Sequence, residues 1–205
     1  MKSFDNKFLS GSIQTIAGVD EAGRGPLAGP VVAAAVIFDN NFFLEEVNDS
    51  KKLTETAREK LFPEIINNAK AYGIGIVWQN EIDRINILQA ALKAMKIAVS
   101  NLSIKPDLAL IDGNKTFFSE IVTKPVIKGD SKSFAIAAAS IIAKVTRDKI
   151  MIEAAVKHPE YGWERNKGYG TKEHIAAIKK YGITKYHRKS FLGRILNAQQ
   201  LIIRT

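Results

Sequence analysis

Four acidic residues of this sequence lie close to a glycine, each at the end of a short apolar run that we interpret as a strand. They are Asp20, Glu21, Asp112 and Asp130. If their carboxylates converge, the repulsion is severe, because two like charges about 4 Å apart cost roughly 4 kcal/mol at an effective dielectric near 20. Divalent cations relieve such repulsion, and an all-oxygen donor set selects Mg²⁺ or Mn²⁺ over Zn²⁺. The acids therefore indicate a site for Mg²⁺ or Mn²⁺.

Metals bound by carboxylates beside a basic surface indicate phosphodiester chemistry. In such sites one metal activates the attacking water and a second stabilises the leaving oxygen. A simpler interpretation stays open, since aspartate before glycine is also a common turn pair. Neighbouring side chains on a strand face opposite ways, so Asp20 and Glu21 can share one site only if regular strand geometry ends near them. No ligand spacing links the histidines to these acids, and we assign no metal role to His158, His174 or His187.

A glycine loop, residues Gly23–Pro30, follows the first acidic pair. Its spacing invites comparison with a dinucleotide-binding loop, but that loop needs a helix directly after the glycines. Here Pro26 and Pro30 interrupt, and the next run, Val31–Phe38, is short, β-branched and typical of a buried strand. The glycine loop therefore connects two strands, and its bare backbone lets N–H groups approach an anion.

Composition bounds the function further. Lysine and arginine number 30 against 21 acidic residues in 205, a net charge of +9 that favours a polyanionic partner, nucleic acid in particular, over simple solubility. The sequence has no cysteine, and its longest apolar run, Val31–Phe38, is far too short to span a membrane. The first residues lack the apolar core of a signal peptide. We therefore expect a cytoplasmic protein with no membrane partner.

Alternating strands and helices must position the acids and the glycine loop. Strands are predicted at about 12–20, 30–38, 72–78, 107–111 and 125–127. After a loose arm at 1–11, helices are predicted from Thr54, kinked or divided at Pro63, from Asn80 to about 102, over 131–156, from Thr171 to about Lys180, and from Ser190. In the third strand, Gly73 and Gly75 leave one face bare, so that another backbone can come close. The helix over 131–156 is apolar on nearly all sides until Arg147 and Asp148, which begin its solvated half.

This alternation predicts an α/β fold in two parts, a catalytic core over 1–156 and a helical substrate-binding appendage over 157–205, together one compact unit. The positive charge is concentrated in the second part, at Lys179, Lys180, Lys185, Arg188, Lys189 and Arg194. That concentration favours a nucleic-acid surface, with Arg188 among its substrate contacts. Another basic stretch, Ser50-Lys51-Lys52, precedes a helix N-terminus and is either an anion site or a solvated loop.

Seven short motifs follow one another in an order that resembles one known family. They are Gly18–Pro26, Asp49–Leu53, Ile111–Asn114, Lys128–Ser131, Ala137–Ile141, Ala143–Asp148 and Lys167–Tyr169. Each motif alone is weak, but the ordered set spans residues 16 to 191 and resembles the signature of the type 2 ribonuclease H family, ribonuclease HII.

The resemblance implies an RNase H-like core, in which helices flank a mixed central sheet, followed by a helical C-terminal appendage. It implies endonucleolytic hydrolysis of RNA in RNA–DNA hybrids and cleavage 5′ of single ribonucleotides in duplex DNA. It also implies a two-metal-ion mechanism that leaves a 5′-phosphate and a 3′-hydroxyl. The expected partners are these two kinds of duplex, and the expected state is a monomer.

The resemblance also assigns roles to individual residues. The metal ligands are expected to be Asp20, Glu21, Asp112 and Asp130. The residues Gly23, Arg24 and Gly25 are expected to contact the ribose 2′-hydroxyl at the RNA–DNA junction, and Tyr169 to pack against the neighbouring deoxyribose. Residues around Ser50 and Lys51 are expected to contact phosphates. One departure from the family is Gly193 where a proline is usual, which affects the terminal helix and not the chemistry.

Two rival functions remain at this stage. Ribonuclease HIII is the sister family, but its members usually carry an extra N-terminal domain and a different glycine loop, whereas only about a dozen residues precede the first predicted strand here. A non-catalytic nucleic-acid-binding module needs the basic surface but not four acids at strand ends. Cleavage and binding measured with and without magnesium separate these possibilities.

Overall fold

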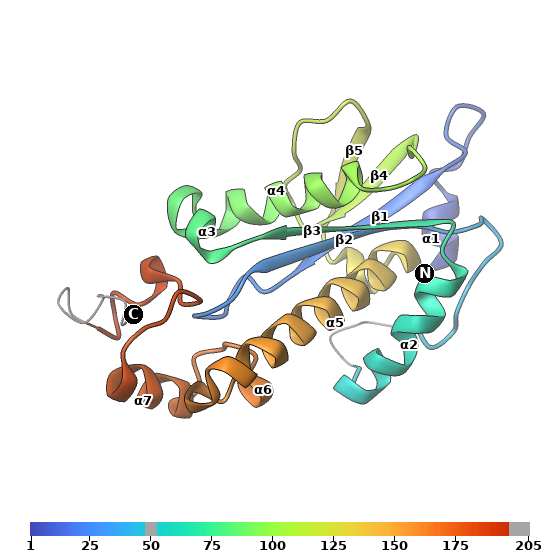
Figure 1. Ribbon diagram of the computed structural model, residues 1–205. Coiled ribbons are helices and arrows are strands. Elements are labelled where there is room, and N and C mark those ends of the chain that lie inside the picture. The colour runs from blue at the N-terminus through green and yellow to red at the C-terminus, as the bar shows by residue number, and fades with distance from the viewer. Residues whose placement is uncertain (48–52, 197–205) are drawn as a thin grey trace.

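The computed structural model describes residues 1–47 and 53–196, which form a five-stranded sheet with helices on both faces (Figure 1). Ser50 and Lys51, expected to contact phosphates, lie outside the described residues, as does the C-terminal end of the chain. Within the described ranges, no helix combines the length and the apolar character needed to cross a membrane.

The sheet is mixed, as expected, with the strand order β3-β2-β1-β4-β5. Its strands are β1 (Ile16–Ala22), β2 (Val31–Ile37), β3 (Ala71–Val77), β4 (Leu108–Asp112) and β5 (Val122–Val126). β2 runs antiparallel to β1 and to β3, whereas β1 and β5 run parallel to β4. β2 is a continuous apolar run because helices cover both of its faces. Edge strand β5 carries Pro125, a residue that a sheet tolerates at its edge.

Helices bury both faces of the sheet. α4 (Ile87–Ser100) packs on one face, and α5 (Phe134–Lys157) and α2 (Glu55–Asn68) cover the other (Figure 1). As predicted, α5 is the central buried helix, and its first half is rich in alanine and buried except at Ser140 and Lys144, which are half-buried. Small side chains let this helix approach the sheet closely, which brings its second half under the glycine loop.

Glycines let the helices lie directly against the strands, which confirms the bare face predicted for β3. A Cβ atom added at Gly73 would lie 2.2 Å from the carbonyl oxygen of Ala98, and one at Gly75 would lie 2.0 Å from that of Ala94. On the other face, a Cβ atom at Gly18 of β1 would lie 2.1 Å from the main chain of α5. Any side chain at these positions would force strand and helix apart.

The helix predicted from Asn80 to about 102 is wrong, because two helices occupy that stretch. α3 (Gln79–Ile85) ends at Asn86, which has a left-handed φ of 68°. The Asn86 side chain accepts hydrogen bonds from the N–H groups of Leu88 and Gln89 and so caps α4. Conversely, α2 is one helix through Pro63, because Leu61 and Ile65 are buried on either side of the proline and hold both halves on the core.

The arm predicted at 1–11 contains a short helix, α1 (Lys2–Asn6). Its Asp5 is buried and accepts a hydrogen bond of 3.1 Å from the N–H of Ala135 in the first turn of α5, which anchors the arm. Other predicted boundaries shift by a few residues: β1 begins at Ile16, β5 begins at Val122, and α5 begins only after Ser133, whose side chain caps it.

The C-terminal residues pack against α5 and the glycine loop. They contain α6 (Trp163–Asn166) and α7 (Lys172–Tyr181), and Thr171 caps α7 as predicted. Around Ser190 a single 3-10 turn, η3 (Lys189–Phe191), stands where a helix was expected to start. One apolar cluster contains Ala28 of the glycine loop, Met151 of α5, and residues from Tyr161 to Leu196. The division into parts at residue 156 stays a prediction, and this cluster crosses it.

Replacing Gly75 by alanine should lower the free energy of unfolding by about 1–3 kcal/mol, because the new methyl group overpacks the contact between β3 and α4. Urea unfolding followed by circular dichroism measures the change. Gly11→Ala is the matched control, since nothing lies within 4 Å of its Cβ position. Equal stability of the two variants would contradict the close packing described here.

Candidate active site at the carboxyl ends of the parallel strands

The parallel pairing of β1 with β4 brings two of the predicted acids together. The last pair in register is Val19 with Ile111, so Asp20 and Asp112 come next, at the carboxyl end of both strands. Ligands of α/β sheets usually bind at this end. The two carboxylates therefore meet because of strand register and not because of a flexible loop.

Glu21 lies near both of them, and β1 ends one residue after it, at Ala22, so regular strand geometry ends close to the acidic pair, as a shared site requires. Ala22 itself still pairs with Val32 of β2. The Oδ1 atom of Asp20 accepts a hydrogen bond of 2.7 Å from the N–H of Glu21. This local contact fixes the Asp20 carboxyl group at the end of the strand.

The expected repulsion is present among Asp20, Glu21 and Asp112. Asp20 is only 5% exposed. Burial raises the pKa of Asp20 well above its ordinary value, and the charges of Glu21 and Asp112 raise it further. Burial also raises the pKa of Glu21, against the opposing effect of Arg24, whose Nη1 lies 3.4 Å from Oε1 of Glu21. Asp20 and Glu21 are therefore costly to ionise in the folded protein without a further cation.

Asp130 is placed by a tight turn beside Asp112. Lys128 has a left-handed φ of 55° and leads into the 3-10 turn η1 (Gly129–Ser131). The N–H of Gly129 donates a hydrogen bond of 2.7 Å to Oδ1 of Asp112, and Asp130, the next residue, is buried. A Cβ atom at Gly129 would lie 2.6 Å from Cδ1 of Ile136, so a larger residue in this turn would require the Ile136 side chain to shift. Asp130 thus directly follows Gly129, the residue that donates a hydrogen bond to Asp112.

The donor set fits a hard divalent cation. It consists of carboxylate oxygens, and the single positive charge of the neighbouring Arg24 does not neutralise them all. Mg²⁺ and Mn²⁺ prefer such negatively charged oxygen ligands. Among residues 1–47 and 53–196, however, no three acids or histidines are already arranged as a metal-binding cluster. Asp20 and Asp112 accept main-chain N–H groups, and Glu21 contacts Arg24. Each of these contacts uses one carboxylate oxygen, and an ionised carboxylate has further lone-pair sites, so the contacts still allow the groups to bind a cation once the side chains move closer together.

The glycine loop continues directly from the acids, and its glycines have different surroundings. Gly23 has a φ of +97°, and a Cβ atom there would lie 2.1 Å from Nε of Arg147. The bare face of Gly23 therefore accommodates a buried side chain. Gly25 is exposed, and the nearest atom to its Cβ position is Cε1 of Tyr169, at 3.7 Å. The predicted substrate residues Gly25 and Tyr169 thus lie side by side at the surface, with exposed Arg24 next to them.

Sequence reasoning missed Arg147, and it placed Arg188 differently from the structure. Arg147 was expected to begin the solvated half of its helix, yet it is fully buried. Arg188 was expected at the substrate surface, and it is also fully buried. Both guanidinium groups donate to main-chain carbonyl groups of the glycine loop. The only available signal for Arg147 was a single charge inside an apolar helical stripe.

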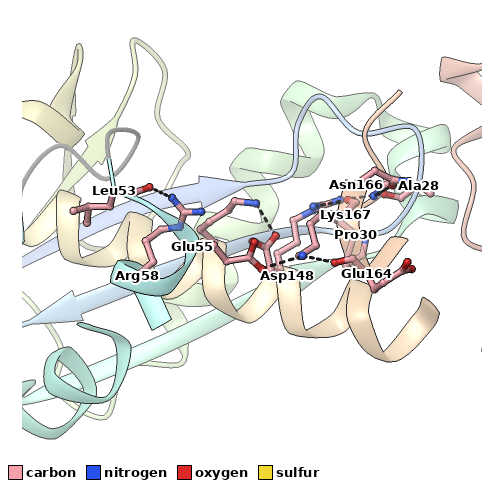
Figure 2. A network of polar contacts seen from close by, with 12 residues as sticks. Ala28, Pro30, Leu53, Glu55, Arg58, Asp148, Glu164, Asn166 and Lys167 are labelled. Carbon is pink, nitrogen blue, oxygen red and sulfur yellow. Dashed lines mark hydrogen bonds and ion pairs between the residues drawn. The ribbon is translucent and has the colours of Figure 1, made fainter. Parts of the chain in front are cut away.

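A polar network ties the neighbouring segments to this loop (Figure 2). Nζ of Lys167 lies 3.0 Å from Oε1 of Glu55 in α2 and donates to the carbonyl oxygen of Glu164 at 2.6 Å. Arg58 of the same helix donates to the carbonyl oxygen of Leu53. The start of α2 is therefore linked to the turn that carries Tyr169.

A buried histidine pair supports Tyr169 from behind. His174 Nδ1 lies 2.9 Å from the carbonyl oxygen of Tyr169, and Nε2 accepts from the indole N–H of Trp163 at 3.0 Å. His187 accepts the N–H of Thr184 on Nδ1, so its Nε2 carries the proton and donates to His174 at 3.2 Å. Burial, with the neighbouring His174, lowers the pKa of His187 to about 3. The pair is neutral, and it fixes the main chain at Tyr169.

Comparison with known proteins adds an independent finding. A profile of the family described as Ribonuclease HII matches residues 17–194. The chain is 61% identical over 176 residues to Ribonuclease HII of Acetivibrio thermocellus, covering 86% of this chain and 69% of that protein. It is 52% identical over 193 residues to Ribonuclease HII of Caldicellulosiruptor bescii, covering 94% of both.

Solved structures agree on the fold. Ribonuclease H2 of Pyrococcus horikoshii superposes with a TM-score of 0.76 at 30% identity, covering 88% of this chain and 96% of that one. A ribonuclease HIII in complex with Mn²⁺ superposes with a TM-score of 0.63 at 19% identity, covering 93% of this chain and 64% of that one, which is a likeness of fold alone.

Replacing Asp20 by asparagine should raise the melting temperature of the metal-free protein at pH 7, because it removes a buried charge that lies beside two others. The folded-state pKa of Asp20 lies above the unfolded value, so its ionisation costs stability as pH rises through that pKa. The two proteins should therefore converge in acid. Added MgCl₂ should stabilise the wild type more than the variant. Thermal unfolding in EDTA and in MgCl₂, across pH, measures both effects.

Asp107→Asn is the control of opposite sign. Asp107 accepts the N–H groups of Gln14 and Thr15, each at 2.9 Å, and these bonds lower its pKa. Its replacement should therefore lower the melting temperature at pH 7. A metal-free Asp20→Asn protein less stable than the wild type would contradict the repulsion described here.

Proposed function

The chain belongs to the ribonuclease HII family and is a type 2 ribonuclease H endonuclease, and we propose that it cuts on the 5′ side of a single ribonucleotide in duplex DNA. The observation that carries this specificity is the position of Tyr169 next to Gly25, in the loop that follows the acids. Carboxylates and metals recognise phosphate, which RNA and DNA share. The 2′-hydroxyl alone distinguishes the two, since it both donates and accepts a hydrogen bond. A recognition element must therefore expose main-chain groups close to the carboxylates.

The glycine loop meets that requirement. Arg24 and Gly25 are exposed, and the loop is covalently continuous with Asp20 and Glu21. Recognition of the 2′-hydroxyl by Gly23, Arg24 and Gly25 is therefore held in register with the acids. Tyr169, 43% exposed, then packs against the next sugar, which lacks the hydroxyl. Such an arrangement favours a junction between ribonucleotide and deoxyribonucleotide over uniform DNA.

The four acids are the proposed metal ligands and catalytic residues: Asp20, Glu21, Asp112 and Asp130. These acids would hold Mg²⁺ or Mn²⁺, which would supply a water nucleophile at neutral pH and neutralise charge on the phosphate. The acids fix the cation site, and with it the reacting phosphate, at the strand ends. Hydrolysis adds the water oxygen to phosphorus and breaks its bond to the 3′ oxygen of the preceding deoxynucleotide, which takes the proton. The products are a 3′-hydroxyl and a 5′-phosphate on the ribonucleotide.

Charge distribution supports a duplex as the partner. Lys179, Lys180, Lys185 and Lys189 are exposed on the C-terminal residues that pack against the glycine loop. We propose that residues 157–205 position the duplex, that the enzyme works as a cytoplasmic monomer, and that long RNA–DNA hybrids are cut at the same site. The binding-module alternative leaves the buried acids unexplained. The HIII alternative is less favoured, since the HIII structures match at 16–20% identity against 52–61% for the HII relatives.

The enzyme should cut a DNA duplex that contains one ribonucleotide, at its 5′ side, and leave the same duplex made entirely of DNA intact. Asp112→Asn should abolish cleavage while binding without metal persists. Gel analysis of end-labelled duplexes in MgCl₂ measures cleavage, and fluorescence anisotropy in EDTA measures binding. Cutting of the all-DNA duplex, or cutting only within runs of ribonucleotides, would overturn the junction specificity. Tyr169→Ala should reduce cleavage of the single-ribonucleotide duplex more than cleavage of a long hybrid.

Removing positive charge from the C-terminal surface should weaken duplex binding and flatten its salt dependence. Because each phosphate contact contributes about 0.9 to the slope of log K against log salt, Lys185→Ala/Lys189→Ala should reduce that slope by up to about 2. Lys70→Ala/Lys105→Ala removes the same charge just before β3 and β4, at the opposite end of the sheet, and should leave the slope unchanged. If both double variants show the same slope, the C-terminal surface faces away from the duplex.

A further inference from the structure

Two buried arginines contact the glycine loop, one from α5 and one from the C-terminal residues. Arg147 comes from α5. Arg188 directly follows His187, which forms an isolated β-bridge with Ala28 of the loop. Neither arginine side chain is exposed. Burial is the main cause that lowers the pKa of Arg188, to about 9, and that of Arg147. Burying two guanidinium cations costs free energy, so the hydrogen bonds that offset this cost indicate the role of the two side chains.

Arg188 binds the carbonyl oxygens of the recognition residues themselves. Its Nη2 donates to Gly23 at 2.6 Å and its Nη1 donates to Arg24 at 3.0 Å. The same guanidinium donates from Nε to Gly29 at 2.9 Å and from Nη2 to Pro30 at 3.1 Å. One planar group therefore fixes both ends of the glycine loop.

Arg147 joins this loop to the turn that carries Tyr169. Its Nε donates to Pro30 at 3.0 Å, and its Nη2 donates to Ala28 at 3.1 Å. Its Nη1 donates to the carbonyl oxygen of Lys167 at 3.0 Å, and its guanidinium carbon lies 5.9 Å from the centre of the Tyr169 ring. The positions of the loop and of Tyr169 are thus set by one side chain.

These bonds orient the recognition residues. Since Arg188 holds the carbonyl groups of Gly23 and Arg24 inward, the peptide planes that follow them turn their N–H groups away from the guanidinium. Across the described residues, 1–47 and 53–196, no hydrogen bond is donated by the N–H of Arg24 or Gly25. Neither buried arginine forms an ion pair with a described carboxylate. Both guanidinium groups are committed to shaping main chain and not to neutralising acids.

We propose that Arg147 and Arg188 are positioning residues for ribonucleotide recognition: they hold the glycine loop so that its N–H groups face the 2′-hydroxyl beside Tyr169. This inference rests on the proposed function. Arg188 then acts through the loop and does not contact substrate. Lysine cannot replace it, because an ammonium group is a compact donor that cannot reach four carbonyl groups at both ends of the loop.

The test is Arg188→Lys, which keeps the positive charge and removes the planar guanidinium group with its several N–H donors. Its kcat/KM on the single-ribonucleotide duplex should fall roughly 10- to 100-fold, the effect of a recognition element displaced by about 1 Å. The fall should lie in kcat, and duplex affinity in EDTA should be kept, because phosphate contacts come from other residues. Cleavage of a long hybrid, which offers a 2′-hydroxyl in every register, should fall less. Amide exchange should accelerate in residues 23–30 and not in β1.

Arg165→Lys is the matched control, since Arg165 is exposed and pairs with Glu164 and Glu173 away from the loop. It should change none of these quantities. Arg147→Lys is the second variant and should shift the same substrate ratio. If both variants lose equal activity on the two substrates, or neither folds by circular dichroism, the arginines serve general stability and the inference is overturned.

The inference and the proposed function fail in different ways. A wild-type enzyme that cuts hybrids but ignores a single ribonucleotide refutes the junction specificity, whatever the variants do. A wild-type enzyme that cuts both substrates, with an unchanged ratio in Arg188→Lys, leaves the function standing and refutes the positioning role.

Discussion

Like charges are buried side by side on both sides of the glycine loop, and the architecture around it follows from that constraint. On one side, strand register brings the carboxylates of Asp20 and Asp112 together at the end of β1 and β4. On the other side, Arg147 lies close enough to Arg188 for its charge to add to the effect of burial and lower the pKa of Arg188. The acids gain from a divalent cation, and the arginines gain from carbonyl groups that only a loop without ladder bonds can offer. A strand-to-strand connection with bare glycines supplies such carbonyl groups, and it places the proposed recognition loop directly after the proposed metal ligands.

Much of this arrangement can be predicted from sequence because it depends on local patterns. Acids at the ends of apolar runs locate the carboxyl edge of the sheet, since strand ends are marked by composition and by glycine. The bare face of β3 follows from alternation, and the caps at Thr54 and Thr171 follow from side-chain chemistry that operates within three residues. The order and spacing of the motifs also predict the family, and the comparisons with known proteins confirm it.

The remainder depends on contacts between distant segments, which no local pattern records. Arg147 looks like the start of a solvated helix face because its partners, Ala28, Pro30 and Lys167, lie up to 119 residues away. The break at Asn86 is hidden because the apolar stripe continues across it, although Asn86 adopts a left-handed φ. Asp5 is similar: an acid in a polar arm gives no sign that it caps a helix 130 residues later. Charged residues buried by tertiary structure are thus the ones that pattern reasoning places at the surface.

The glycine loop is therefore completed by the C-terminal residues and not by its own sequence. The N–H of Leu27 donates to Gly168, that of Gly29 donates to Tyr186, and that of Arg188 donates to Leu27, each at 2.8 Å. Such bonds close only when the C-terminal segment has docked on α5, because nothing in the strand connection itself supplies these partners. The carboxylates of β1 and β4, in contrast, are brought together by strand register and do not need the C-terminal residues. Sheet pairing thus brings the proposed metal ligands together, and docking of the C-terminal residues completes the loop to which we assign recognition, so the two proposed roles depend on different levels of the fold.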